Sequence, residues 1–134
     1  MPAVFVDTSA WFALYVPDDQ DHSAAVTWFE ANHRPLVTTD YVIDELLTLL
    51  RFRREHRRSI EVARDFTEAP AMIRIERISS ADFKAAIEVF QRFGDKLWSF
   101  TDCTSRAVMD RLDIHEAFSF DEHFRQFGTV TVLP

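Results

Sequence analysis

The segment AVFVDTSAWFAL, residues 3–14, places an acid where one pattern of apolar residues gives way to another. Residues 4–6 form a short apolar run of the kind found in strands that are buried on both faces. Asp7 follows this run directly, and residues 8–15 then predict a short helix. A carboxylate at the end of a buried strand either caps the next helix or takes part in chemistry at the edge of the sheet.

The rest of the chain alternates between strand and helix patterns. Short apolar or alternating runs predict strands within residues 3–7, 35–39, 72–78, 115–120 and 129–134. Helical periodicity and capping residues predict helices within residues 8–15, 18–33, 40–56, 59–69, 79–94, 99–112 and 121–128. This alternation predicts an α/β layer fold with a mostly parallel sheet, in which ligands bind at the carboxyl ends of the strands. We expect residues 1–134 to form one domain.

Composition limits the function classes. A net charge of −7 argues against a protein that binds nucleic acid through a uniformly basic surface. The chain has only two glycines, which excludes a glycine-rich phosphate-binding loop. Cys103 is the only cysteine, so no internal disulfide is possible and a reducing, cytoplasmic setting is expected. We also expect no signal peptide and no membrane span.

Basic residues are concentrated in one short segment. Of the 15 basic residues 13 are arginine, whose planar fork suits phosphate. The segment RFRREHRR, residues 51–58, contains Arg51, Arg53, Arg54, Arg57 and Arg58. This segment is either a solvated helix end or a contact for a nucleic-acid backbone, and the sequence leaves both interpretations open.

Two further acids stand at positions that invite the same question as Asp7. Asp121 follows the apolar residues AFSF, just as Asp7 follows the first strand. Asp102 lies in the first turn of a predicted helix that Ser99 or Thr101 can cap. An acid there is favoured by the helix dipole, so capping alone accounts for each position. A helix N-terminus beside a sheet edge is also a common location for phosphate chemistry.

Glu45 is distinguished from its neighbour Asp44 by helical spacing. Glu45 lies on one line with Val42 and Leu49, which points it towards the interior. Asp44 lies on the polar line that holds Asp40, Thr48 and Arg51. An inward acid is costly without a partner, unless its long side chain bends outwards at the edge of the apolar stripe.

The four acids together predict a cation site. Carboxylates about 5 Å apart repel by roughly 3 kcal/mol per pair at an effective dielectric constant near 20, so a cluster needs protons or a cation. All-oxygen ligands select Mg²⁺ or Mn²⁺ rather than zinc. The five histidines show no metal-ligand spacing, and we assign them structural or surface roles. Cys103 is assigned to the core.

The sequence resembles the PIN-domain family, and within it the VapC-type toxins of bacterial toxin–antitoxin pairs. The matching segments occur in family order across almost the whole chain: VFVDTSAW, YVIDELLTLL, LWSFTDCTS and FSFDEHFRQFG. The resemblance implies an α/β/α sandwich around a parallel sheet. It also implies a Mg²⁺-dependent endoribonuclease that is usually a homodimer and is held inactive by a cognate antitoxin.

Carried over by position, the family's acids are Asp7, Glu45, Asp102 and Asp121, with Ser9 and Thr101 as polar residues that support them. Asp7, Asp102 and Asp121 would hold one or two ions, and Glu45 would orient a water or complete the ligand set. The implied reaction is hydrolysis of an RNA phosphodiester by a metal-activated water. The arginines of residues 51–58 would bind the RNA backbone.

Three other interpretations stay open at the level of sequence. The first is a catalytically silent RNA- or protein-binding module on the same fold, which the presence of all four acids disfavours. The second is a phosphotransferase with Asp7 as nucleophile, although such enzymes usually need an acid two residues later, where this chain has Ser9. The third is a nuclease that acts on DNA.

Overall fold

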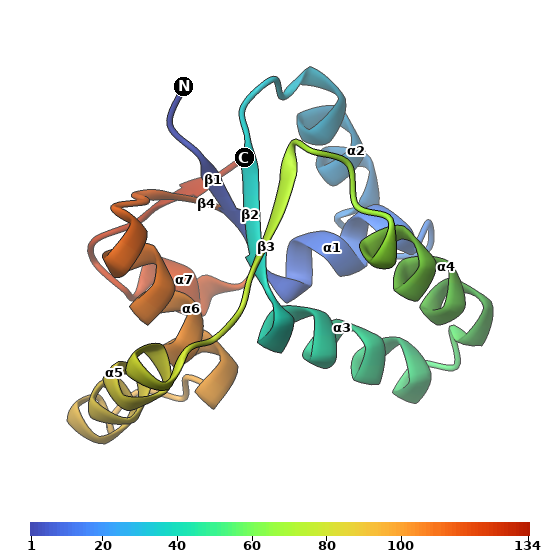
Figure 1. The fold of residues 1–134 in the computed structure, drawn as a ribbon. Helices are drawn as coiled ribbons and strands as arrows, with labels where there is room; N and C mark the ends of the chain where they lie inside the picture. The colour runs from blue at the N-terminus through green and yellow to red at the C-terminus, as the bar shows by residue number, and fades with distance from the viewer.

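The computed structural model describes residues 1–134 and contains one five-stranded sheet. Its strand order is β3-β2-β1-β4-β5, and every neighbouring pair is parallel (Figure 1). The strands are β1 (Val4–Val6), β2 (Leu36–Thr39), β3 (Ile73–Glu76), β4 (Glu116–Phe118) and β5 (Thr131–Leu133). The predicted mostly parallel sheet is therefore confirmed, and it is parallel throughout.

Helices cover both faces of this sheet. They are α1 (Thr8–Tyr15), α2 (His22–Ala31), α3 (Asp40–Phe52), α4 (His56–Thr67), α5 (Ser80–Arg92), α6 (Phe100–Leu112) and α7 (Glu122–Arg125). In Figure 1, α1 to α4 lie to one side of the sheet and α5 to α7 to the other. The predicted α/β/α sandwich is thus confirmed. None of these helices combines the length and the apolar character that crossing a membrane requires.

The central strands are buried on both faces, as a parallel sheet between two helical layers requires. All three residues of β1 and all four of β2 are buried. Aromatic contacts join the sheet to both layers. Phe5 of β1 stacks on Phe124 of α7 at a ring-centroid distance of 6.2 Å, and Phe118 of β4 stacks on Trp28 of α2 at 4.1 Å. The core therefore fixes the ends of β1 and β4 relative to the helices that follow them.

The long helix predicted over residues 40–56 is shorter in the structure. α3 ends at Phe52 because Arg54 adopts a left-handed conformation with φ of 60°. The amide of Glu55 then donates to the carbonyl of Leu50 at 2.8 Å, which closes the helix end, and α4 begins at His56. Glycine usually occupies such a position, so the arginine gives no sequence signal for the break.

The arginine segment consequently spans the end of α3, a tight bend and the start of α4. Arg51 donates from Nε to the hydroxyl of Ser59 at 3.0 Å, which ties the two helices together. Arg58 forms an ion pair with Glu55 at 3.5 Å. The other three arginines of the segment, Arg53, Arg54 and Arg57, are exposed and form no ion pair.

Thr38 links three elements inside the core. Its side chain is fully buried in β2, and its hydroxyl accepts a hydrogen bond from the indole nitrogen of Trp11 in α1 at 3.2 Å. The same hydroxyl donates to the carbonyl of Val6 in β1 at 3.0 Å. Both partners are buried, so the hydroxyl satisfies groups that have no access to water.

Thr38→Val should lower the free energy of unfolding by about 1–3 kcal/mol, because it leaves the Trp11 N–H without a partner in the interior. Urea unfolding followed by fluorescence measures this. Thr131→Val is the matched control, since Thr131 lies in the edge strand β5 and is exposed. A loss no greater than that of the control would show that the hydroxyl contributes little to stability.

Candidate active site

The carboxyl ends of β1 and β4 lie side by side, and Asp7 directly follows β1. Val6 is paired with Phe118, and the amide of Asp7 donates to the carbonyl of Phe118 at 3.3 Å. This register brings Asp7 opposite Ser119, one residue beyond each strand. The apolar strands therefore deliver two polar side chains to the same edge of the sheet.

Asp7 is 4% exposed and accepts three hydrogen bonds. Its Oδ1 accepts from the hydroxyl of Ser9 at 2.8 Å and from the amide of Ala10 at 3.2 Å, and its Oδ2 accepts from the hydroxyl of Ser119 at 2.9 Å. Burial raises the pKa of Asp7 to about 7, although these hydrogen bonds lower it, and the nearby charge of Asp121 raises it further. Asp7 also caps α1 through its bond to Ala10.

Ser119 contacts Asp7, and the sequence analysis did not predict this. Besides donating to Asp7, its hydroxyl accepts from the amide of Asp121 at 3.0 Å. The hydroxyl of Ser9 in turn accepts from the amide of Phe120 at 2.9 Å. The two serines therefore cross-link the ends of β1 and β4. The signal was present in AFSF, where a lone polar residue follows the strand, but its use depends on knowing which strand pairs with β1.

Asp102 caps a helix and also faces the other acids. Its amide donates to the hydroxyl of Ser99 at 3.0 Å, and its Oδ2 accepts from the amide of Ser99 at 3.0 Å. Burial raises the pKa of Asp102 to about 6; the Ser99 bond and His123 lower it, and the charges of Asp121 and Glu45 raise it. Ser99 is thus the cap of α6, one of the two alternatives that the sequence offered.

Thr101 is not hydrogen-bonded to any of the acids through its side chain. Its backbone carbonyl accepts from the hydroxyl of Thr104 at 2.7 Å within α6. Thr101 is partly buried beside Asp102 in the first turn of the helix. No hydrogen bond therefore connects Thr101 to the acids, and its predicted supporting role stays a prediction.

Asp121 caps α7 and lies next to a histidine. Its Oδ1 accepts from the amide of His123 at 2.9 Å. The ring Nδ1 of His123 lies 3.4 Å from Asp121 Oδ1 and 3.5 Å from Asp102 Oδ2. One donor atom from each of these three residues lies within 4.8 Å of the others, a spacing that can hold a metal ion. The sequence analysis gave His123 a structural or surface role, whereas the structure places it between two acids.

Glu45 and Asp44 differ in exposure as their helical positions predict. Asp44 is exposed, whereas Glu45 is partly buried on α3 and its charge acts on Asp102. The charge of Asp121 acts on both Asp7 and Asp102. Electrostatic interactions therefore connect all four predicted acids at one edge of the sheet.

No lysine or arginine forms an ion pair with any of the four acids, and His123 is the only basic side chain within 4.0 Å of them. His123 is thus the only basic side chain of the chain that offsets part of the repulsion among the carboxylates. Carboxylate oxygens with one imidazole nitrogen make a donor set that suits a divalent ion. The residues present therefore fit a metal site, with Asp102, Asp121 and His123 closest to one another and Asp7 and Glu45 beside them.

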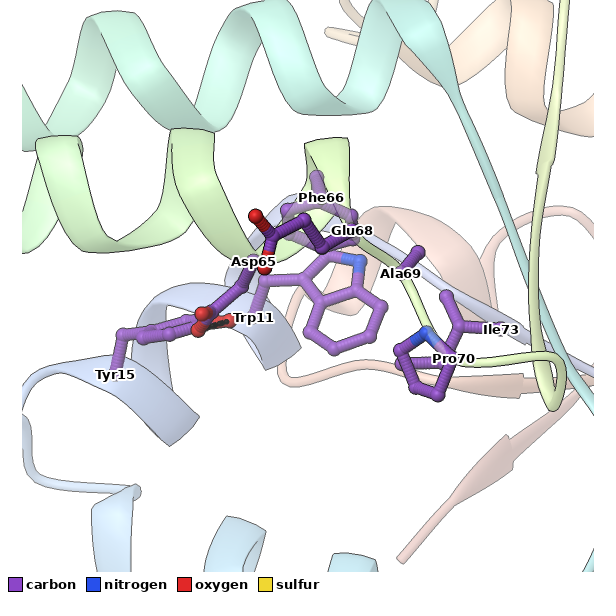
Figure 2. Close-up of a pocket in the computed structure, with 8 residues that line it drawn as sticks. All are labelled: Trp11, Tyr15, Asp65, Phe66, Glu68, Ala69, Pro70 and Ile73. Carbon is purple, nitrogen blue, oxygen red and sulfur yellow. Dashed lines mark hydrogen bonds between the residues drawn. The ribbon is translucent and has the colours of Figure 1, made fainter.

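The arginine segment stands apart from the acids. It begins six residues after Glu45 on α3, which corresponds to about 9 Å along a helix at 1.5 Å per residue. A separate pocket lies between α1, α4 and the start of β3 (Figure 2). In it Tyr15 donates to Asp65 at 2.9 Å beside the indole of Trp11 and the ring of Phe66. None of the four predicted acids lines this pocket.

Two ribonucleases of known name have sequences similar to that of this chain over most of its length. The "23S rRNA-specific endonuclease VapC20" of Mycobacterium tuberculosis is 33% identical over 131 residues, which covers 98% of each chain. The "VapC ribonuclease" of Archaeoglobus fulgidus is 28% identical over 127 residues, which covers 91% of this chain and 79% of the relative.

Solved structures have the same fold. The crystal structure of M. tuberculosis VapC20, described as a "Sarcin-Ricin loop cleaving toxin", matches with a TM-score of 0.90 over 98% of this chain and 99% of that chain. A toxin–antitoxin complex from Klebsiella pneumoniae matches at 13% identity with a TM-score of 0.64, covering 98% and 96% of the two chains. The sequence of residues 4–130 matches the family model of the PIN domain. The chain therefore belongs to the PIN-domain family.

Proposed function

We propose that this protein is a divalent-metal-dependent endoribonuclease and the toxin of a toxin–antitoxin pair. The observation that carries the proposal is the convergence of Asp7, Glu45, Asp102 and Asp121 at the carboxyl edge of the sheet without a lysine or arginine partner. Mg²⁺ is the proposed ion, with Mn²⁺ as an alternative. A catalytically silent binding module would not need to keep four mutually repelling carboxylates together.

RNA is the proposed substrate because both named relatives are ribonucleases and the more similar one is named for 23S rRNA. Ribosomal RNA is therefore the first substrate to test, with DNA as the comparison. The exposed arginines of the segment from residue 51 to 58 would bind the RNA backbone on one side of the acids. Such contacts position a strand without reading its sequence.

Each acid has a proposed role that follows from its surroundings. Asp7, fixed by Ser9 and Ser119, and the pair Asp102 and Asp121 would hold the ion through their free oxygen lone pairs. Glu45, partly exposed and free of hydrogen bonds to the chain's other side chains, would accept a proton from the attacking water or hold that water in line with phosphorus. When bound, a divalent ion would supply the positive charge that activates water and stabilises the leaving oxygen.

A toxin that cuts cellular RNA must be restrained, so we also propose a cognate antitoxin protein as partner. The 33% identical relative of known structure is described as a toxin, which supports this assignment. We further propose that residues 1–134 act as one PIN-like domain, that the protein is a homodimer and that it acts in the cytoplasm, where ribosomal RNA is found.

The metal requirement is tested with purified protein and ribosomes or total RNA. Cleavage should occur with Mg²⁺ or Mn²⁺ and stop with EDTA, because the acids need a cation to act together. Because water is the proposed nucleophile, the new ends should carry a 5′-phosphate, which primer extension and end-labelling detect. Full activity in EDTA would contradict the proposal, and a 2′,3′-cyclic phosphate would instead indicate attack by the ribose hydroxyl.

Glu45→Gln should reduce the cleavage rate by about a hundredfold or more, the scale that follows loss of an electrostatic catalytic group. Asp44→Asn should leave cleavage nearly intact and change the free energy of unfolding by less than about 0.5 kcal/mol, as for surface sites. The two substitutions are chemically alike and adjacent on α3. Equal losses of activity would therefore refute the assignment of Glu45 to the inner face of α3. A larger loss in Asp44→Asn than in Glu45→Gln would assign the catalytic role to Asp44.

Stability of the metal-free protein should depend on pH through Asp7. Its pKa is about 7 in the folded protein and 3.8 in the reference state, so the folded state binds the proton more tightly. The free energy of unfolding should then fall as pH rises from about 4 to about 7 and level off above that range. Asp7→Asn should remove much of this slope in urea unfolding in EDTA, while Asp44→Asn should retain it. An unchanged slope in Asp7→Asn would contradict the assignment.

A further inference from the structure

His123 is the one basic side chain that reaches the acids, and the four-acid proposal does not use it. It is the second residue of α7, and its amide is held by the cap residue Asp121. Its side chain is 28% exposed, so the ring lies at the border between the acids and solvent. Phe124, the next residue, is fully buried and packs on Phe5, which fixes this turn of α7 against the sheet.

The ring Nδ1 of His123 lies farther from both carboxylates than a charged hydrogen bond would place it. A charged N–H···O contact settles at about 2.7–2.9 Å. The Nδ1 atom lies 3.4 Å from Asp121 Oδ1 and 3.5 Å from Asp102 Oδ2. Donor atoms about 2.0–2.2 Å from one octahedral ion lie about 2.8–3.1 Å from each other at angles near 90°. Both contacts are therefore only about 0.3–0.7 Å longer than the separation of neighbouring ligands of one ion, and a small closing movement of the ring and the two carboxylates would bring them to it.

We propose that His123 is a nitrogen ligand of the divalent ion and that it shifts the preference of the site from Mg²⁺ towards Mn²⁺. This inference rests on the proposed metal-dependent function. Carboxylates alone serve both ions, whereas imidazole favours first-row transition ions and gains little from Mg²⁺. His123 thus determines which ion the site binds, and the acids determine that it binds an ion at all.

The chain supplies a matched histidine for comparison. His115 also stands two residues after an aspartate, and its Nε2 lies 2.8 Å from Oδ1 of Asp113. That distance is an ordinary hydrogen bond, and the pair is exposed, with 68% of the His115 side chain accessible. The same D-x-H spacing therefore gives a paired surface histidine at one place and a histidine between two acids at the other.

The test compares wild type, His123→Asn and His115→Asn as metal-free proteins. Asparagine can place an amide oxygen near the position of Nδ1, so the substitution exchanges nitrogen for oxygen with little change in size. Calorimetric titration with Mn²⁺ and with Mg²⁺ gives two dissociation constants for each protein. His123→Asn should weaken Mn²⁺ binding about tenfold or more, while Mg²⁺ binding changes far less. His115→Asn should match wild type with both ions.

A second measurement identifies the coordinating atom directly. Electron spin echo spectra of Mn²⁺ bound to wild type should show coupling to a coordinated nitrogen, and this coupling should be absent in His123→Asn. Mn²⁺ binding without nitrogen coupling, or an unchanged ratio of the two dissociation constants in His123→Asn, would overturn the role of His123 and leave the proposed nuclease intact. If wild type bound neither ion and cut no RNA, the proposed function would fail as well.

Discussion

The arrangement of the site depends on one buried carboxylate, that of Asp7, at the end of the innermost strand. Three donors from the chain hold it, and two of them are the serines that also join the ends of β1 and β4. Burial nevertheless keeps its pKa near 7, so the hydrogen bonds do not offset the cost of removing the charge from water. The folded chain therefore holds a carboxyl group that gives up its proton less readily than an exposed aspartate, and a bound cation would favour its charged form.

Most of the architecture was predictable because it rests on local patterns. Buried strands such as Val4–Val6 are short apolar runs, and the capping serines precede their helices at the expected spacing. The break at Arg54 was not predictable, since a left-handed residue other than glycine leaves no mark in the sequence. The helix over residues 40–56 was for that reason predicted too long.

The positions of the four acids could be predicted from the sequence, whereas the positions of the residues around them could not. Glu45 stood out by its position on an apolar line, and the structure gives it the partly buried environment that this line predicts. Ser119 and His123 reach the acids only through the register of β4 against β1 and through the orientation of α7 against α6. Such contacts join residues distant in sequence, and a single sequence without its strand order does not reveal them.

Three of the four acids also begin helices: Asp7 caps α1, Asp121 caps α7, and Asp102 completes the cap of α6. Glu45 lies in the middle of α3 and is the only one of the four whose side chain accepts no backbone hydrogen bond. Replacing one of the three capping acids by a residue without a side-chain acceptor therefore removes a helix cap as well as a carboxylate. Glu45 is therefore the position at which the chain would lose a carboxylate with the least cost to its helix ends.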